Sequence, residues 1–309
     1  MNSGGGNELN GIAQLVPLFR ELSHLKRIRV PGLPGSVAQR VFERAWTRLV
    51  GGEDLESVAL QETAHAVAAT KLAGIDAAVL ADGGVDEAAR LAVFQRAFDA
   101  AAVDVPGDLA GRLREALSAA PFAAPEVATL PTFVSRLAAQ PRAGATRPGH
   151  PRVVLEPAEN HAEHCAVVAV NAVLASGCFG GDAATAFLTG LSHHLHNAYL
   201  PDAGDAGDVL LGEFHGRLMD TFRRRALSEL PGSLGEAARA SLDAVYRADF
   251  AEARCFQAAD SLDRVLEMEW HARSAQFTLD TALQDMDIIH PGPVQAFQLE
   301  IMRSVGWLR

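Results

Sequence analysis

The alternation of apolar and polar positions along the chain has the period of α-helices over most of its length. In residues 37–50, VAQRVFERAWTRLV, apolar side chains recur three and four positions apart, which predicts an amphipathic helix. A second helix is predicted between Asp54, a plausible N-terminal cap, and Gly74, a plausible end. The nearest candidate for a β-strand, PRVVLEP, is short and bounded by prolines. The pattern therefore predicts an all-α protein.

Four prolines and two glycines gather in residues 140–158, QPRAGATRPGHPRVVLEPA. Because these residue types interrupt regular structure, we predict a domain boundary near residue 150. A smaller helical domain of unknown role is expected over residues 11–150, and a second helical domain over residues 151–309. Residues 1–10 are predicted to form a flexible leader. The further helices expected from the pattern span residues 86–104, 107–120, 131–139, 159–176, 181–199, 207–230, 234–250, 250–284 (broken) and 292–307.

Composition and charge narrow the class of protein. A hydrophobic content of 49% is ample for a buried core, and a net charge of −11 argues against a general nucleic-acid binder. The N-terminus does not read as a signal peptide, and apolar runs such as CAVVAVNAVLA are shorter than the roughly 20 residues that cross a bilayer. Three widely spaced cysteines support neither a disulfide framework nor a cysteine zinc site. We therefore expect a cytoplasmic protein without a membrane partner.

Histidine is concentrated in one part of the chain, where six of the eleven histidines lie between residues 161 and 215. His161 and His164 are three positions apart and share one face at the start of a predicted helix. A second group stands at the end of the next predicted helix and comprises His193, His194 and His196. A helix dipole favours a cation there and accounts for one histidine, but three are harder to explain. Because neutral imidazole is the commonest metal ligand, the clusters suggest a metal site.

A third segment, QAADSLDRVLEMEWH, carries Asp260 beside two alanines on a predicted helix with an apolar face. A carboxylate is costly to bury there unless something neutralises it. Taken alone, Asp260 and Asp263 are more simply interpreted as surface acids, and an isolated His-x-x-His pair as solvated. Together the segments form an ordered pattern: a histidine, a His-His pair 29 residues later, and an aspartate 66 residues beyond.

This order resembles the HD superfamily of helical metal-dependent phosphohydrolases, whose ligands run His, His-Asp, Asp. The segment ENHAEHC is similar to the start of the bacterial 5′-deoxynucleotidase branch and maps the first ligand onto His164. LSHHL stands where the family has its His-Asp signature, which maps onto His193 and His194. AADSLDRVLEMEW resembles the helix whose aspartate closes the site, here Asp260. The resemblance covers about residues 150–290 and implies a multi-helix HD-like bundle.

The sequence departs from the family at its central aspartate, which is His194 here. Imidazole removes a negative charge and softens the site, so the implied cofactor is a divalent transition metal: Fe, Co, Ni, Mn or Zn. The replacement of the family's aspartate by His194 is equally compatible with weak metal binding or with loss of phosphatase activity. In this register Asp202 stands at the position of a catalytic-loop aspartate, and Asn197 replaces a glutamate of the branch. An alternative register takes His196 and Asn197 as the pair and places Asp205 at the catalytic position.

His161 and His196 are reserve ligands or substrate contacts, and His215 is either a further reserve ligand or a surface or pocket residue. His215 stands about where the mixed-valent diiron oxygenases of the superfamily carry an extra histidine, but their second extra histidine has no counterpart between residues 216 and 270. A phosphate-binding arginine of the family maps loosely onto Arg147 or Arg152.

The resemblance implies hydrolysis of a small phosphorylated, nucleotide-like substrate by a metal-activated water, which Asp202 or Asp205 would position or deprotonate. Two alternatives stay open. One is a degenerate HD domain that senses or scaffolds without turnover, and the other is an iron-dependent oxygenase. In the hydrolase interpretation, the N-terminal domain would cover the pocket or mediate homodimer formation. The chain carries no phosphate loop, no GxGxxG after a predicted strand and no GxSxG motif.

Overall fold

Helices make up 70% of the chain, and the part of it that the structure describes contains no β-strand. The structure is a computed structural model and describes residues 3–119, 129–150, 152–275, 278–285 and 288–308. The all-α fold class predicted from the sequence is confirmed. The proline-bounded candidate strand contributes an isolated bridge between Val153 and Ala145.

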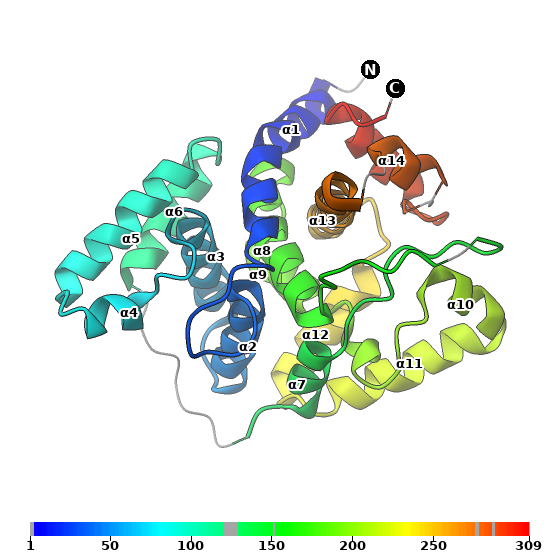
Figure 1. Cartoon of the computed structure of the whole chain (residues 1–309), viewed down its shortest axis with the longest axis horizontal. Helices are drawn as coiled ribbons and strands as arrows, with labels where there is room; N and C mark the ends of the chain where they lie inside the picture. The colour runs from blue at the N-terminus through cyan, green and yellow to red at the C-terminus, as the bar shows by residue number, and fades with distance from the viewer. Residues whose placement is uncertain (1–2, 120–128, 151, 276–277, 286–287, 309) are drawn as a thin grey trace.

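Helix α8 lies at the centre of the arrangement and packs against α9, α13, α1, α2, α3 and α7 (Figure 1). The elements are α1 (Ser3–His24), α2 (Val37–Val50), α3 (Leu55–Leu72), α4 (Ala77–Asp82), α5 (Glu87–Ala101), α6 (Gly107–Ala119), α7 (Thr132–Ala139), α8 (His161–Phe179), α9 (Ala183–Ser192), η1 (Leu195–Ala198), α10 (Gly204–Leu211), α11 (Phe214–Leu227), α12 (Gly232–Ala244), α13 (Ala251–Ala275), η2 (Thr281–Asp285) and α14 (Gln295–Ser304). Of these, η1 is a 3-10 helix and η2 is a π-helix.

The strongest periodic segments form the helices expected of them. Helix α2 has the predicted bounds, and Ser36 caps it by accepting a hydrogen bond from the backbone N–H of Gln39. Asp54 caps α3 in the same way, as the sequence predicts. Helix α3 ends two residues before Gly74, where a Cβ atom would approach the carbonyl oxygen of Arg29 to 3.1 Å. Glycine therefore suits this close contact between chain segments.

Other elements differ from the prediction. Residues 3–10 are not a flexible leader but the first turns of α1, while residues 1–2 lie outside the described part of the chain. The apolar positions of α1 bury themselves against α8 and α13, which stabilises the helix despite Pro17 within it. The helix predicted over 207–230 is two helices, because Gly212 adopts a positive φ of 52° between α10 and α11. The helix predicted over 181–199 likewise ends early and continues as η1.

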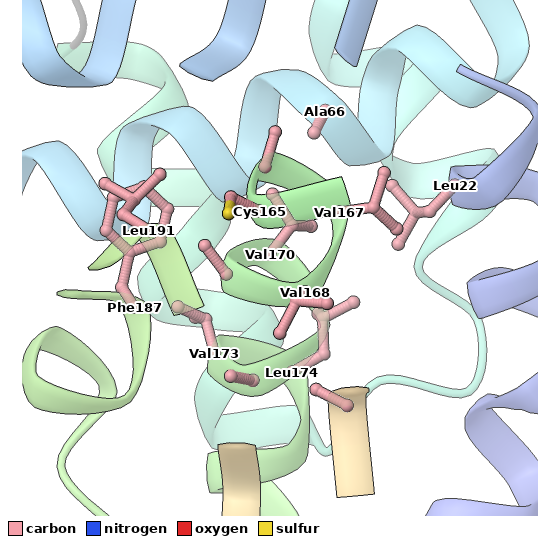
Figure 2. Packing of buried hydrophobic residues seen from close by; sticks show 14 of the residues in the cluster. Leu22, Ala66, Cys165, Val167, Val168, Val170, Val173, Leu174, Phe187 and Leu191 are labelled. Atoms are coloured by element: carbon pink, nitrogen blue, oxygen red, sulfur yellow. The ribbon is translucent and has the colours of Figure 1, made fainter. Parts of the chain in front are cut away.

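Helix α8 is almost completely buried, and its apolar side chains meet those of α1, α3 and α9 (Figure 2). Where α8 meets α9 the two backbones come very close. A Cβ atom on Gly190 would lie 2.4 Å from the Cα atom of Ala169. Because His193 stands three residues after Gly190, this close approach sets how near its ring lies to the first turn of α8.

The same helix satisfies the length and composition of a membrane span, with a mean hydropathy of 1.4. The apolar run CAVVAVNAVLA lies within this helix, which passes these two criteria over its 19 residues. However, 89% of that apolar window is buried inside the fold, which is typical of a core helix.

One cluster of buried apolar side chains extends from Ile12 to Met302. Helices α1, α2 and α3 pack directly on α8, so elements on both sides of residue 150 share this core. The domain boundary near residue 150 stays a prediction. What the structure shows is that helices from both sides of residue 150 pack against α8, which carries His161 and His164.

Candidate metal centre

The first predicted ligand, His164, lies in the first turn of α8. That turn is fixed by a capping box, in which Asn160 and Glu163 each accept a hydrogen bond from the other's backbone N–H at 2.9 Å. Although a lone His-x-x-His pair at a helix start is more simply solvated, the His164 side chain is fully buried. Its Nδ1 lies 2.7 Å from Oδ2 of Asp263 on α13.

The pair His193 and His194 follows the last residue of α9. Nδ1 of His193 lies 2.7 Å from the carbonyl oxygen of Gly190, and Nδ1 of His194 lies 2.7 Å from Oδ1 of Asn197. The orientation of the Asn197 amide is set because its Nδ2 donates to the carbonyl of Leu200 at 3.2 Å. Both contacts therefore place an oxygen acceptor against Nδ1, which must carry the proton.

Three predicted ligands, His164, His193 and His194, come together at one point, and the fourth, Asp260, lies beside the first two. Nε2 of His164 lies 3.1 Å from Nε2 of His193, and Oδ1 of Asp260 lies 3.3 Å from the former and 3.9 Å from the latter. The ring of His194 stacks at an angle on that of His193, with 4.2 Å between centroids. Helices α8, α9 and α13 thus bring together residues that are far apart in the sequence.

This arrangement fits a metal ion. Because Nδ1 faces an oxygen acceptor in both rings, Nε2 of His164 and Nε2 of His193 are left to face one another across 3.1 Å. Such an approach is repulsive unless a cation or a proton lies between the rings. Two ligands about 2.1 Å from one metal, at angles of about 90–109°, lie about 3.0–3.4 Å apart. The observed separation falls in that range.

The electrostatics of the site keep the ligands in their metal-binding forms. Burial lowers the pKa of His193 to about 3, with the neighbouring His164 acting in the same direction. Burial also lowers the pKa of His194 well below its usual value. Burial by itself would raise the pKa of Asp260, but Arg264, at 2.9 Å, and the histidines outweigh it and hold that pKa well below its usual range. The imidazoles of His193 and His194 are thus neutral and the carboxylate is ionised near neutral pH.

Two groups of buried side chains in the described part of the chain could hold a metal ion. One comprises His164, His193 and His194, and the other comprises Glu159, His164 and Asp263. In the second group the ammonium of Lys26 already lies 2.6 Å from a Glu159 oxygen and 2.7 Å from an Asp263 oxygen. Arg142 lies 2.8 Å from the other Glu159 oxygen, so the two carboxylates of that group face two cations, which leaves the three histidines as the better candidate.

The reserve histidines occupy different positions. His161 is fully buried, with its ring centroid 4.8 Å from that of His194, and neither ring nitrogen has a hydrogen-bond partner. His196 stands on the other side of His194, at a centroid distance of 5.7 Å. His215 belongs to neither candidate group and lies 3.6 Å from a carboxylate oxygen of Asp208. His161 and His196 therefore flank the centre, whereas His215 lies on the wall of the cavity next to it.

The three residues expected to act in catalysis, Asn197, Asp202 and Asp205, all line the cavity beside the histidines but make different contacts. Asn197 holds the ring of His194 and thus positions a ligand. Asp202 accepts backbone hydrogen bonds from Ala143 and Gly204, both at 2.9 Å, so each of its oxygens is engaged. Asp205 lines the cavity beside the histidines.

A cavity of about 530 Å³ opens onto the candidate centre. It has three arginines on its walls: Arg142, Arg223 and Arg264. The arginines that the resemblance suggested for phosphate binding lie elsewhere, since Arg147 donates to the backbone carbonyl of Asp285 and Arg152 to two other carbonyls. A larger cavity of about 750 Å³ lies between α2, α3 and α7 and is lined by none of the predicted site residues.

Sequence reasoning missed two residues that support the candidate ligand His164: Asp263, which contacts its ring, and Lys26, which pairs with Asp263. Asp263, interpreted as a surface acid, is completely buried against His164. Its spacing of three from Asp260 was a usable signal, because both then face the same neighbour. Lys26 gave no such signal, since it lies far away in the sequence.

Comparisons of the chain with protein-family models, with curated proteins and with solved structures find no match. The candidate centre is therefore defined by the geometry of its own side chains. The resemblance to the HD superfamily rests on the short segments around His164, His193 and Asp260.

Proposed function

We propose that this chain is a metal-dependent hydrolase of a small phosphorylated, nucleotide-like substrate. The metal would be a divalent transition ion held by His164, His193, His194 and Asp260. The observation that supports it is the set of three imidazoles whose Nδ1 atoms face oxygen acceptors, with the Nε2 atoms of His164 and His193 beside the ionised carboxylate of Asp260. When bound, such a metal lowers the pKa of water and polarises a phosphoryl oxygen.

The charge balance favours an anionic substrate. Asp260 is paired with Arg264, and Asp263 with Lys26, so these four charges cancel. Because imidazole binds a metal in its neutral form, a divalent ion held by the three histidines would leave the centre with two positive charges. A phosphate monoester near neutral pH carries a matching negative charge of about −1.5 to −2.

The chain's own residues divide the remaining tasks. Arg223 and Arg264 both line the cavity and have a buried Nε without a hydrogen-bond partner. Because Arg264 is paired with Asp260 at 2.9 Å, Arg223 is the better placed of the two to donate to a phosphate. Asp205 is the better candidate for moving a proton, because the oxygens of Asp202 are held by backbone N–H groups. Phe256 and Tyr246 line the same cavity and offer surface for a planar organic group. A volume of about 530 Å³ suits a ligand of that size.

The test combines metal analysis with phosphate release. The purified chain is compared with His193→Ala, Asp260→Ala and the control His150→Ala, which alters an exposed histidine outside the centre. We expect a stoichiometric transition metal and release of phosphate from a panel of nucleoside monophosphates in the wild type and the control. Both should be lost in the two ligand variants, with helical circular dichroism retained. Metal bound without any hydrolysis would instead indicate a sensor or scaffold.

A second candidate function is O₂-dependent chemistry at an iron site. It is favoured by His161 and His196, which add two buried imidazoles beside His194 and make the surroundings unusually rich in histidine. Iron-dependent optical absorption with O₂ consumption would support this function. Phosphate release by the zinc- or manganese-loaded protein, without O₂ consumption, would exclude it.

A further inference from the structure

Lysine is almost absent from this chain, which has two lysines against 25 arginines. One of them, Lys71, forms an exposed ion pair with Glu21. The other, Lys26, follows the end of α1, and its side chain is only 1% exposed. Burying an ammonium costs free energy unless nearby carboxylates neutralise it, so the groups around Lys26 indicate its role.

Lys26 is held by carboxylates from two distant parts of the chain. Its Nζ lies 2.6 Å from Glu159, 2.7 Å from Asp263 and 3.5 Å from Glu267. Burial by itself would lower the pKa of Lys26, but these three acids raise it, so the ammonium stays charged. A compact ammonium can face three carboxylates at once, whereas a planar guanidinium directs its donors in a fixed fork.

Lys26 is linked to the candidate metal centre through a single carboxylate oxygen of Asp263. Oδ2 of Asp263 lies 2.7 Å from the Lys26 ammonium and 2.7 Å from Nδ1 of His164. A carboxylate behind a ligating histidine fixes the tautomer of its ring and raises its basicity. Because Lys26 neutralises this carboxylate and holds it in place, the orientation of His164 depends on a residue in the turn that follows α1.

We propose that Lys26 is a positioning residue of the metal centre, which acts on His164 through Asp263 and makes metal binding depend on the docking of α1. This inference rests on the proposed metal site. Docking of α1 on α13 is supported by neighbouring contacts: Arg20 pairs with Glu269 at 3.0 Å, and Arg27 pairs with Glu267 and stacks on Trp270. Metal binding should in turn tighten the end of α1, because linkage is reciprocal.

The test uses Co²⁺ as the probe, because its visible absorption reports the ligand geometry. Binding is measured for the wild type, Lys26→Met and the matched control Lys71→Met. We expect Lys26→Met to bind Co²⁺ about 10–100-fold more weakly, as is usual when a group behind a ligand is removed, and to shift the absorption bands. Lys71→Met should match the wild type. A purely structural Lys26 would lower stability but leave the affinity and spectrum of the folded protein unchanged, and that result would overturn the proposal.

A second measurement covers the case in which Lys26→Met does not fold. Hydrogen exchange of the wild type is followed with and without Co²⁺. We expect slower exchange at the end of α1 when Co²⁺ is bound, and unchanged exchange in α6, which is remote from the centre. Equal exchange in α1 would overturn the proposal.

The outcomes also separate this inference from the proposed function. A wild type that binds Co²⁺ and shows both effects, but releases no phosphate, would refute the hydrolase and leave the role of Lys26 standing. Hydrolysis with unchanged Co²⁺ binding in Lys26→Met would do the reverse. A wild type that binds no metal at all would refute both.

Discussion

The contact between α8 and α9 gives a sharp test of the candidate centre, since it can be altered without touching a ligand. In Gly190→Ala the new Cβ atom would lie 2.4 Å from Cα, 2.6 Å from N and 3.0 Å from Cβ of Ala169. All are backbone or Cβ atoms and cannot rotate away. To restore a contact of 3.4 Å, the two helices must separate by about 1 Å locally.

That displacement is large on the scale of a metal site. The Nε2 atoms of His164 and His193 are 3.1 Å apart, and ligands must be held within about 0.5 Å of their productive positions. We therefore expect Gly190→Ala to lower the affinity for Zn²⁺ or Co²⁺ at least about tenfold, because imperfect support of a ligand costs that much. Overpacking should also destabilise the fold by about 1–3 kcal/mol.

The assay pairs urea unfolding with competition binding of Zn²⁺. The control is Gly216→Ala in α11, where the new Cβ atom meets nothing within 4 Å. Replacing glycine by alanine inside a helix stabilises by about 0.5–1 kcal/mol, so this control should be slightly more stable and bind metal normally. If Gly190→Ala binds Zn²⁺ as tightly as the wild type and unfolds at the same urea concentration, the reasoning from this contact is wrong.

Three further predictions follow from the same geometry. Asn197→Ala removes the acceptor that holds His194 and should weaken Zn²⁺ binding about 10–100-fold, whereas Asn197→Asp should restore most of the affinity; equal binding in all three proteins would contradict this. Because burial lowers the pKa of His193 from 6.5 to about 3, the folded metal-free protein binds fewer protons than the unfolded chain, so its free energy of unfolding should fall as pH drops from 6.5 toward 3. Urea unfolding at several pH values checks this, and His193→Gln should flatten the profile. Chelation should lower the melting temperature, since metal at about 100 times its Kd adds about 2.7 kcal/mol; an unchanged melting curve with EDTA would argue against a bound metal.

The sequence predicted the helices best where an amphipathic period and a cap coincide. Helix α2 and the start of α3 at Asp54 are of this kind. Helix α1 was missed because its first turns hold polar residues and glycines, and Pro17 interrupts the pattern, so its stability comes from burial against α8 and α13. Such tertiary packing overrides local propensity and cannot be read from a short window.

The four candidate ligands could be proposed from their order along the chain, but their supporting residues could not. Asp260 and Asp263 look equivalent in the sequence, yet the former faces the free Nε2 atoms while the latter is buried behind His164. Their roles differ because α13 passes the first turn of α8 at a particular rotation. Lys26 reaches Asp263 across 237 positions, and no local pattern encodes that pairing.

The shared core also limits how the chain can be divided. A fragment beginning near residue 151 would expose the faces of α8 that α1, α2 and α3 cover, and it would leave Asp263 buried without its cation. The histidine cluster therefore could not be transferred to another protein as residues 151–309 alone. Recombination, truncation or fusion would have to carry the opening helices along with it.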